Sequence, residues 1–199
     1  MELDTNVKTF FQSIYGDSNT IEFTFDQKNS LYIPLFATSI EHSLSIHVLD
    51  KQELPVSAFA LARPMVESYL RAMWVKYCLR ADQIQVGCEQ LHFPKRLEAL
   101  LQEVDRAVLE DDRFRGFKSS IEPLITNMHD FTHGGIQSIV RQYGDDGNLT
   151  SPRSREERDE LLKLATLTCS LSYEKLTPFM KSSSSSTEVL NMANKLLEL

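Results

Sequence analysis

The spacing of apolar residues along the chain is that of amphipathic helices over most of its length. Between residues 31 and 50, large apolar side chains recur about every four residues, which predicts one long helix. A second apolar-rich segment covers residues 55–80, and Pro64 inside it must kink or break the helix because proline lacks a backbone N–H. Two long helices joined by a short turn predict an antiparallel hairpin.

Two more helices are predicted in the middle of the chain. Apolar residues repeat with helical spacing over residues 94–109. The next helix is expected to begin at Ser119 or Ser120, which would cap it, and to end near His133 because two glycines follow. The residues after these glycines, 136–143, are expected to form a helical turn or a new helix.

The C-terminal part carries clear signals for helix starts. Ser154 and Glu157 have the S-x-x-E spacing of a capping box, which predicts that a helix begins there. A run of serines at residues 182–186 is low in complexity and predicts a flexible linker. The apolar spacing after it predicts a terminal helix over residues 187–197, which either packs on the domain or contacts a partner.

These patterns together predict an all-α fold, an antiparallel helical bundle of about six to eight helices. The low content of turn residues, 7 Gly and 7 Pro in 199 residues, also favours helices over a β-rich fold. The length suits one domain. We expect residues 1–181 to form it, with residues 182–199 as a linker and an appended helix.

Charge and cysteine content narrow the class of protein. The net charge of −7 and pI near 5.3 argue against broad coating of nucleic acid, which needs a basic surplus. The longest apolar-rich segment contains four charged residues, so no membrane span is expected. The N-terminus lacks the apolar core of a signal peptide, and Cys78, Cys88 and Cys169 are widely spaced. These features predict a cytoplasmic protein with reduced thiols.

The first candidate site is a charged stripe on the apolar segment. Arg63, Glu67 and Arg71 are spaced four residues apart and therefore share one face of a helix. Two guanidinium groups held by one carboxylate form a site suited to phosphate. The alternative is a ladder of ion pairs on the helix surface with a structural role only.

The second candidate site is the segment His129-Asp130-Phe131-Thr132-His133. Two histidines four residues apart on a helix can share a metal ion, although no third ligand follows at a familiar spacing. Without a metal, His133 or His129 is suited to general acid–base catalysis, because the pKa of histidine lies near neutrality. The structural alternative is a histidine that caps the C-terminus of the helix.

A further metal-dependent interpretation uses the adjacent His129 and Asp130. Helical phosphohydrolases of the HD type combine such a dyad with other histidines and aspartates. In this chain the upstream candidates would be His42, His47 and His92. Their order does not match the pattern of that class well, so metal-dependent hydrolysis ranks third among the functions considered.

The segments Arg63-Pro64-Met65-Val66-Glu67-Ser68-Tyr69-Leu70-Arg71-Ala72-Met73-Trp74 and His129-Asp130-Phe131-Thr132-His133-Gly134-Gly135 resemble those of uncharacterised bacterial proteins related to the HEPN superfamily. The resemblance covers roughly residues 30–145. It implies a helical bundle, frequent dimerisation and, in many members, metal-independent ribonuclease activity in phage defence or toxin–antitoxin systems. Other members of that superfamily are inactive binding modules.

By this resemblance, Arg63 and Glu67 match the polar helix of that superfamily, and His133 matches the histidine of its motif. HEPN ribonucleases carry an arginine shortly before the histidine on one helix. Here no arginine stands at that spacing before His129 or His133, so Arg63 and His133 would have to meet through folding.

The leading functional hypothesis is therefore a HEPN-like protein that acts on RNA or a nucleotide, with no metal or other cofactor. His133 would be the acid–base group, Arg63 and Arg71 would hold phosphate, and Glu67 would orient the arginines. The expected partners are RNA or a nucleotide, a second copy of the chain, or a cognate protein. The alternative is a non-catalytic interaction module in which the same residues form a structural network and the terminal helix docks on a partner.

Overall fold

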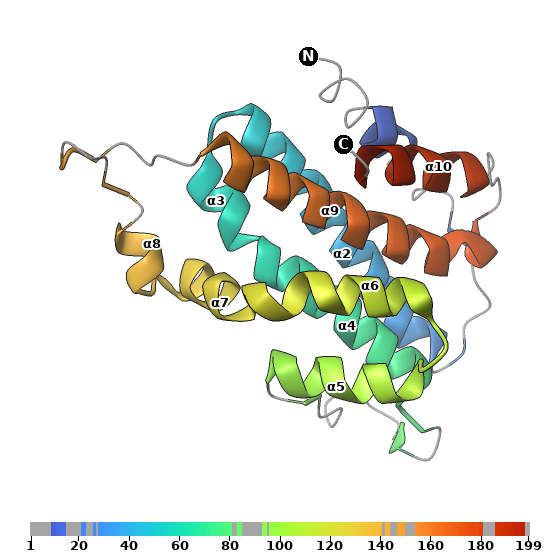
Figure 1. The fold of residues 1–199 in the computed structure, drawn as a ribbon. Helices are drawn as coiled ribbons and strands as arrows, with labels where there is room; N and C mark the ends of the chain where they lie inside the picture. Colours follow the sequence, from blue (N-terminus) through green and yellow to red (C-terminus); the bar gives the residue numbers. More distant parts are fainter. Residues whose placement is uncertain are drawn as a thin grey trace.

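The chain folds as an all-α helical bundle, as the apolar spacing predicts (Figure 1). The computed structural model describes residues 9–14, 21–22, 26, 28–80, 83–84, 93–94, 96–140, 142–143, 147–149, 154–180 and 186–197. Within these residues the regular elements are α2 (Asn29–Lys51), α3 (Pro55–Ala60), α4 (Ala62–Tyr77), α5 (Leu97–Ala107), α6 (Asp112–Ile121), α7 (Ile125–His133), α8 (Ile136–Val140), α9 (Arg155–Leu176) and α10 (Ser186–Leu197). Two 3₁₀ turns, Glu122–Leu124 and Thr177–Phe179, follow α6 and α9.

The predicted hairpin is formed by α2 and α4, and its second arm is broken as Pro64 requires. The break separates α3 from α4 at Leu61, and Pro64 lies in the first turn of α4. Because Pro64 has no N–H, it cannot bond to the carbonyl of Ala60. The Thr132 hydroxyl of α7 lies 3.3 Å from that carbonyl and 2.9 Å from the carbonyl of Met128 in its own helix, so its proton is shared between α7 and the break in the hairpin.

The core is centred on α4, which packs against α2, α5, α7 and α9. Tyr69, Leu70 and Met73 of α4 are fully buried. The ring of Tyr69 lies edge to face with Phe117 of α6, at 4.8 Å between centroids, and 5.9 Å from Phe36 of α2. One apolar face of α4 therefore joins three layers of the bundle.

The start of the middle helices differs from the prediction. Ser119 and Ser120 lie inside α6, where their hydroxyls donate to the carbonyls of Arg115 and Gly116, four residues back. The actual N-cap is Asp111, whose carboxylate accepts from the Phe114 N–H at 3.0 Å. The prediction was wrong because serine can satisfy its hydroxyl within a helix as well as at its start.

The end of α7 agrees with the prediction, and both glycines after it have a structural role. Gly134 has a φ of 67°, in the left-handed region where side chains are strained. A Cβ at Gly135 would lie 2.5 Å from Cγ of Asp130. The paired glycines therefore let the chain turn sharply against Asp130 before α8 begins.

The long helix α9 begins with the predicted capping box. The Ser154 hydroxyl accepts from the Glu157 N–H, and the Glu157 carboxylate accepts from the Ser154 N–H, both at 3.2 Å. The first turns of α9 are also tied to the end of α2. Nε of Arg158 lies 2.7 Å from the Asp50 carboxylate, which is only 10% exposed.

The two ends of the described chain differ in how they meet the body. The predicted terminal helix is α10, which packs on α9 and buries Val189 and Ala193. Most of the predicted serine linker, residues 182–185, lies outside the described residues. In contrast, α8 extends beyond the end of α7 at the left edge of Figure 1, away from the main body of the bundle.

Candidate functional site

The charged stripe of α4 is paired within itself. Nη2 of Arg71 makes a short ion pair with the Glu67 carboxylate, and Nε of Arg63 lies 3.8 Å from the same carboxylate. The side chains of Arg63 and Glu67 are 15% and 29% exposed, whereas that of Arg71 is 39% exposed. One carboxylate therefore partly neutralises both guanidinium groups.

Phe93, from another part of the chain, covers one end of the stripe together with Trp74 of α4. The guanidinium carbon of Arg71 lies 5.0 Å from the centre of the Phe93 ring, a cation–π contact. Phe93 also packs against Trp74, at 5.6 Å between centroids. The indole N–H of Trp74 donates to the Glu103 carboxylate of α5 at 2.6 Å. The stripe thus continues into a packed polar and aromatic cluster.

This arrangement limits how Arg71 could bind an anion. Its Nη2 is directed to Glu67, and its buried Nε has no hydrogen-bond partner among the described residues. A phosphate that used the Nε–Nη2 edge of Arg71 as a fork of two N–H donors would compete with Glu67. The geometry favours the structural interpretation of the stripe. The sequence could not reveal Phe93 and Glu103, since they are distant along the chain.

The histidine pair lies on the exposed side of α7. The rings of His129 and His133 are 4.6 Å apart between centroids, and both side chains are exposed. The opposite side of α7 is anchored, because Phe131 packs edge to face on Phe59 of α3 at 5.3 Å and the Thr132 hydroxyl donates to α3. The histidines are therefore held on a fixed helix and open to solvent.

The metal-binding interpretations gain no support from the arrangement of ligands. The described residues contain no group of three or more His, Cys, Asp or Glu side chains placed to hold one ion. The Asp130 side chain lies against Gly135. His42 and His47 belong to α2, and His92 lies outside the described residues.

The structure does not join the two predicted clusters. Among the described residues, no hydrogen bond, ion pair or ring contact connects Arg63, Glu67 or Arg71 with His129 or His133. The stripe leads towards α5, whereas the histidines lie at the end of α7 that leads to α8. The combined site that the leading hypothesis requires is therefore not formed by direct contacts.

An apolar surface on α8 was missed by the sequence reasoning. Ile136, Ile139, Val140 and Tyr143 are 64%, 51%, 58% and 52% exposed. Their spacing places them on one side of a helical turn, and Leu149, which is 72% exposed, is bridged to Tyr143. We call these five residues the α8 stripe. The signal was present in the sequence as helical apolar spacing, but spacing does not tell a buried stripe from an exposed one.

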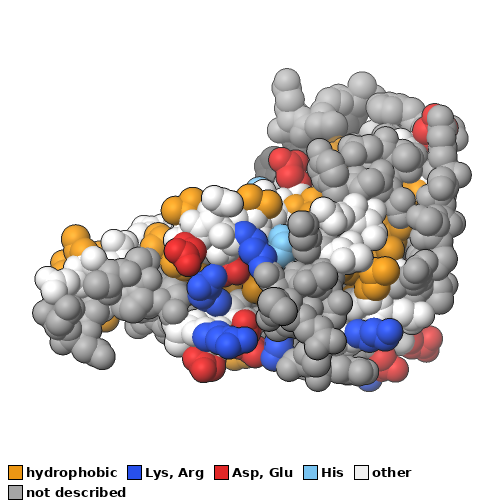
Figure 2. Space-filling model, turned by 90° about the horizontal axis from the view of Figure 1, so that it is seen from above, with side chains coloured by type: hydrophobic (Ala, Val, Ile, Leu, Met, Phe, Trp, Pro, Cys, Tyr) orange, Lys and Arg blue, Asp and Glu red, His pale blue; other side chains and the backbone are white. Residues whose placement is uncertain are grey.

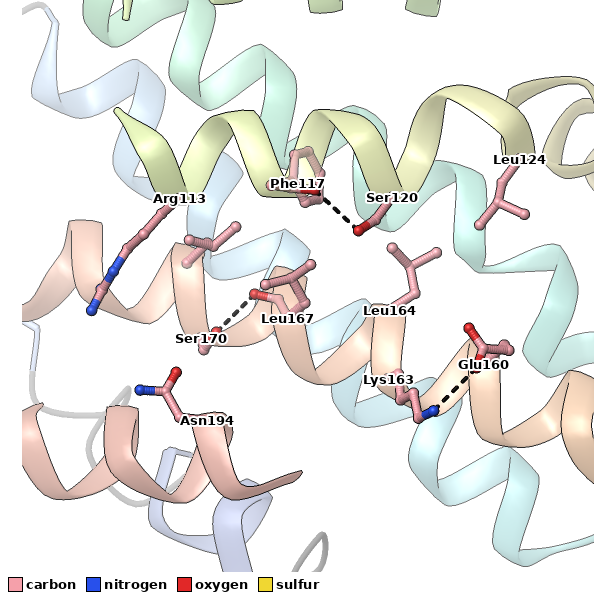
Figure 3. A pocket seen from close by; sticks show the side chains of 12 residues that line it. Arg113, Phe117, Ser120, Leu124, Glu160, Lys163, Leu164, Leu167, Ser170 and Asn194 are labelled. Atoms are coloured by element: carbon pink, nitrogen blue, oxygen red, sulfur yellow. Dashed lines mark hydrogen bonds and ion pairs between the residues drawn. The ribbon is translucent and has the colours of Figure 1, made fainter. Parts of the chain in front are cut away.

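Two cavities follow the length of α9. The first, of about 460 Å³, lies between α6, α9 and α10 (Figure 3). Most of its polar groups are paired within the protein. Arg113 pairs with Glu174 at 2.6 Å, and Lys163 pairs with Glu160 at 3.1 Å. The Ser170 hydroxyl donates to the carbonyl of Leu167 at 2.8 Å.

The second cavity, of about 330 Å³, lies between the α3–α4 break, α7 and α9. It shares Leu124, Glu160 and Leu164 with the first. Its walls are mainly apolar, and its acidic residues all come from the first turns of α9. We call it the α7–α9 pocket.

The charge on the surface is mixed. On the face seen in Figure 2, Lys and Arg side chains lie beside Asp and Glu side chains, and the described residues form no broad basic patch there. The described part of the chain also contains no helix with the length and hydrophobicity needed to cross a membrane.

Neither described cysteine contacts Arg63, Glu67, Arg71 or the histidine pair, although the Cys78 thiol donates to the backbone carbonyl of Glu103 at 3.6 Å. Cys169 is buried in α9, and its burial raises the pKa of the thiol well above the ordinary value. Burial also raises the pKa of Cys78, which is half-buried. A raised pKa keeps a thiol protonated and therefore unreactive, as expected for reduced structural cysteines. Cys88 lies outside the described residues.

These features define an all-helical bundle with an internally paired charged stripe, an exposed histidine pair and a projecting apolar arm. The chain belongs to a family of unknown function (DUF6988), whose sequence model matches residues 36–196. The matched span runs from within α2 to α10 and includes both polar clusters. Neither the curated proteins nor the solved structures contain a match to this chain.

Proposed function

We propose that this chain is a non-catalytic interaction module that associates through the α8 stripe with a second copy of itself. The observation that carries the proposal is the exposure of Ile136, Ile139, Val140 and Tyr143, each more than half open to solvent on an arm that extends from the bundle. The internal pairing of Arg63, Glu67 and Arg71 supports it, since that pairing gives the stripe of α4 a structural role.

The size of the α8 stripe supports a dimer. Five large side chains exposed to this extent present on the order of 500 Å² of apolar surface, within the range of about 300–600 Å² in which the largest patch of a monomer is often functional. Two stripes packed face to face would bury roughly 1,000 Å², the lower bound for a specific interface. An apolar stripe complements a copy of itself across a two-fold axis, the commonest symmetry of soluble oligomers.

Sedimentation equilibrium tests this proposal. The wild type is expected to be a dimer that dissociates on dilution, and the double variant Ile136→Glu/Ile139→Glu is expected to be a monomer, because four charges would face one another in the interface. The control Val48→Glu/Leu109→Glu changes two residues that are 56% and 71% exposed elsewhere, and it should behave as the wild type. A monomeric wild type at high concentration would contradict the proposal.

A second candidate function is metal-independent RNA cleavage, in line with the HEPN resemblance. The observation that favours it is the exposed His129–His133 pair, whose rings are 4.6 Å apart. Two imidazoles so placed can serve as acid and base if one is protonated and the other neutral. The pair lies directly before α8, so a dimer through the α8 stripe would bring two such pairs towards one interface.

A ribonuclease assay with purified protein, with and without EDTA, tests the second candidate. EDTA-resistant cleavage that His133→Ala abolishes would support it, and His42→Ala, at a half-buried position of α2, serves as a control for the loss of a histidine elsewhere. Because His133 is exposed, its replacement by alanine should leave the melting temperature unchanged. Cleavage that EDTA removes would instead favour a metal-dependent reaction, and equal cleavage by the wild type and His133→Ala would exclude a catalytic role for this residue.

A further inference from the structure

The α7–α9 pocket combines an apolar interior with an acidic rim. Seven apolar residues form most of its wall: Phe59, Ala62, Leu124, Met128, Phe131, Leu161 and Leu164. Its volume of about 330 Å³ lies within the range of small-molecule sites, which are mostly apolar with a few polar groups that fix orientation. Among the described residues, no lysine or arginine lines it.

The polar groups of this pocket are almost all anionic. Glu156, Glu157 and Glu160 line it, together with the amide of Asn127. Glu157 is engaged in the capping box, and Glu160 pairs with Lys163 on the side of the other cavity. Glu156 makes no ion pair with a described residue, and its pKa is lowered by backbone and Ser154 hydrogen bonds at the start of α9, so it stays ionised.

Of the two rim carboxylates Glu156 and Glu160, Glu156 leaves a charge for a ligand to neutralise, whereas Glu160 already pairs with Lys163 at 3.1 Å. Glu156 and Glu160 are four residues apart on α9 and therefore lie on one face, where like charges repel. The acidic residues of the first turn are favourable for the helix dipole, but Glu160 lies a turn further on, where that benefit fades. A cation beside Glu156 would add to the compensation that Lys163 gives Glu160. The rings of Phe59 and Phe131, which pack edge to face on each other, line the interior, where an aromatic ring can contact an organic cation.

We propose that the α7–α9 pocket binds a small apolar cation, an organic amine whose hydrocarbon or aryl part enters between α3, α7 and α9 and whose ammonium group meets Glu156 and Glu160. The apolar part provides affinity through burial, and the carboxylates select the charge. This site is separate from the α8 stripe and does not depend on dimerisation.

In the test, the full chain labelled with ¹⁵N is titrated with 4-phenylbutylamine, and its amide chemical shifts are measured by NMR at each step. Saturable shifts are expected within residues 124–131 and 156–164, the two segments that supply most of the lining of the pocket. The neutral analogue 4-phenylbutan-1-ol should bind about fivefold more weakly, since partly exposed ion pairs contribute up to about 1 kcal/mol. The anion 4-phenylbutyrate should bind more weakly still.

Two sets of variants separate charge selection from apolar binding. Glu156→Gln/Glu160→Gln should remove the preference for the amine over the alcohol, whereas the control Glu98→Gln/Glu110→Gln, with two exposed carboxylates elsewhere, should keep it. Phe131→Ala should weaken both ligands alike. Equal affinity of the amine and the alcohol in the wild type, or shifts outside the pocket, would overturn the proposal.

Discussion

At the scale of single residues, Arg71 shows how a plausible anion-binding group can be a structural one. Its charge meets the Glu67 carboxylate, its face lies on the Phe93 ring, and the neighbouring Trp74 bonds to Glu103. The two contacts of Arg71 itself use different properties of its side chain, its charge and its planarity. A lysine could supply the charge but not the planar face.

We expect Arg71→Met to lower the free energy of unfolding by about 1 kcal/mol, since it removes a partly exposed ion pair and a cation–π contact. Urea unfolding followed by circular dichroism measures this. Arg106→Met, at an exposed position of α5, is the matched control and should change stability by less than about 0.5 kcal/mol. Unchanged stability of Arg71→Met together with lost RNA cleavage would show that Arg71 serves catalysis.

Residue identity alone could predict part of the candidate site. The stripe Arg63, Glu67 and Arg71 follows from the four-residue spacing, and its ion pairs form as that spacing requires. Spacing could not tell whether the arginines are free or paired, because Phe93 and Glu103 reach the stripe only after folding. The same limit applies to Arg63 and His133, whose expected meeting depends on how α4 and α7 cross.

At the scale of elements, helices with strong local signals are predicted well. The capping box at Ser154 and the glycine stop after His133 appear where the sequence places them, because both depend on residues within one turn. The predicted start of α6 was wrong. Asp111, Ser119 and Ser120 are all residue types that can cap a helix, and the packing of the bundle selects Asp111. Pro64 predicted a break, and the break lies at Leu61, because the missing N–H of Pro64 would have bonded to the carbonyl of Ala60.

The exposed arm could not be predicted from its sequence. Ile136, Ile139, Val140 and Tyr143 have the spacing of a buried helix face, and the helices of the core show the same spacing. The difference arises from Gly134 and Gly135, which redirect the chain so that α8 leaves the bundle. Exposure of an apolar stripe is a property of the whole molecule, which helical spacing along the chain does not report.

At the scale of the whole molecule, the sequence suggested a domain at residues 1–181 and an appended element at residues 182–199. In the structure α10 packs on α9, and Val189 and Ala193 are 3% and 1% exposed. The family match also extends to residue 196. These observations favour α10 as a part of the domain and make the boundary testable.

We expect truncation after Met180 to destabilise the bundle, because α9 would lose the cover that α10 provides. Burial of one valine side chain contributes about 1.5–3 kcal/mol, and α9 would also expose apolar surface of its own. A loss of about 3 kcal/mol should lower the melting temperature by roughly 10 °C in a chain of this length. Calorimetry on the truncated and full chains measures the shift, with Asn191→Ala/Lys195→Ala, two exposed positions of α10, as the control for the helix surface. Equal melting temperatures would show that α10 is a separable element, as the serine-rich sequence before it first indicated.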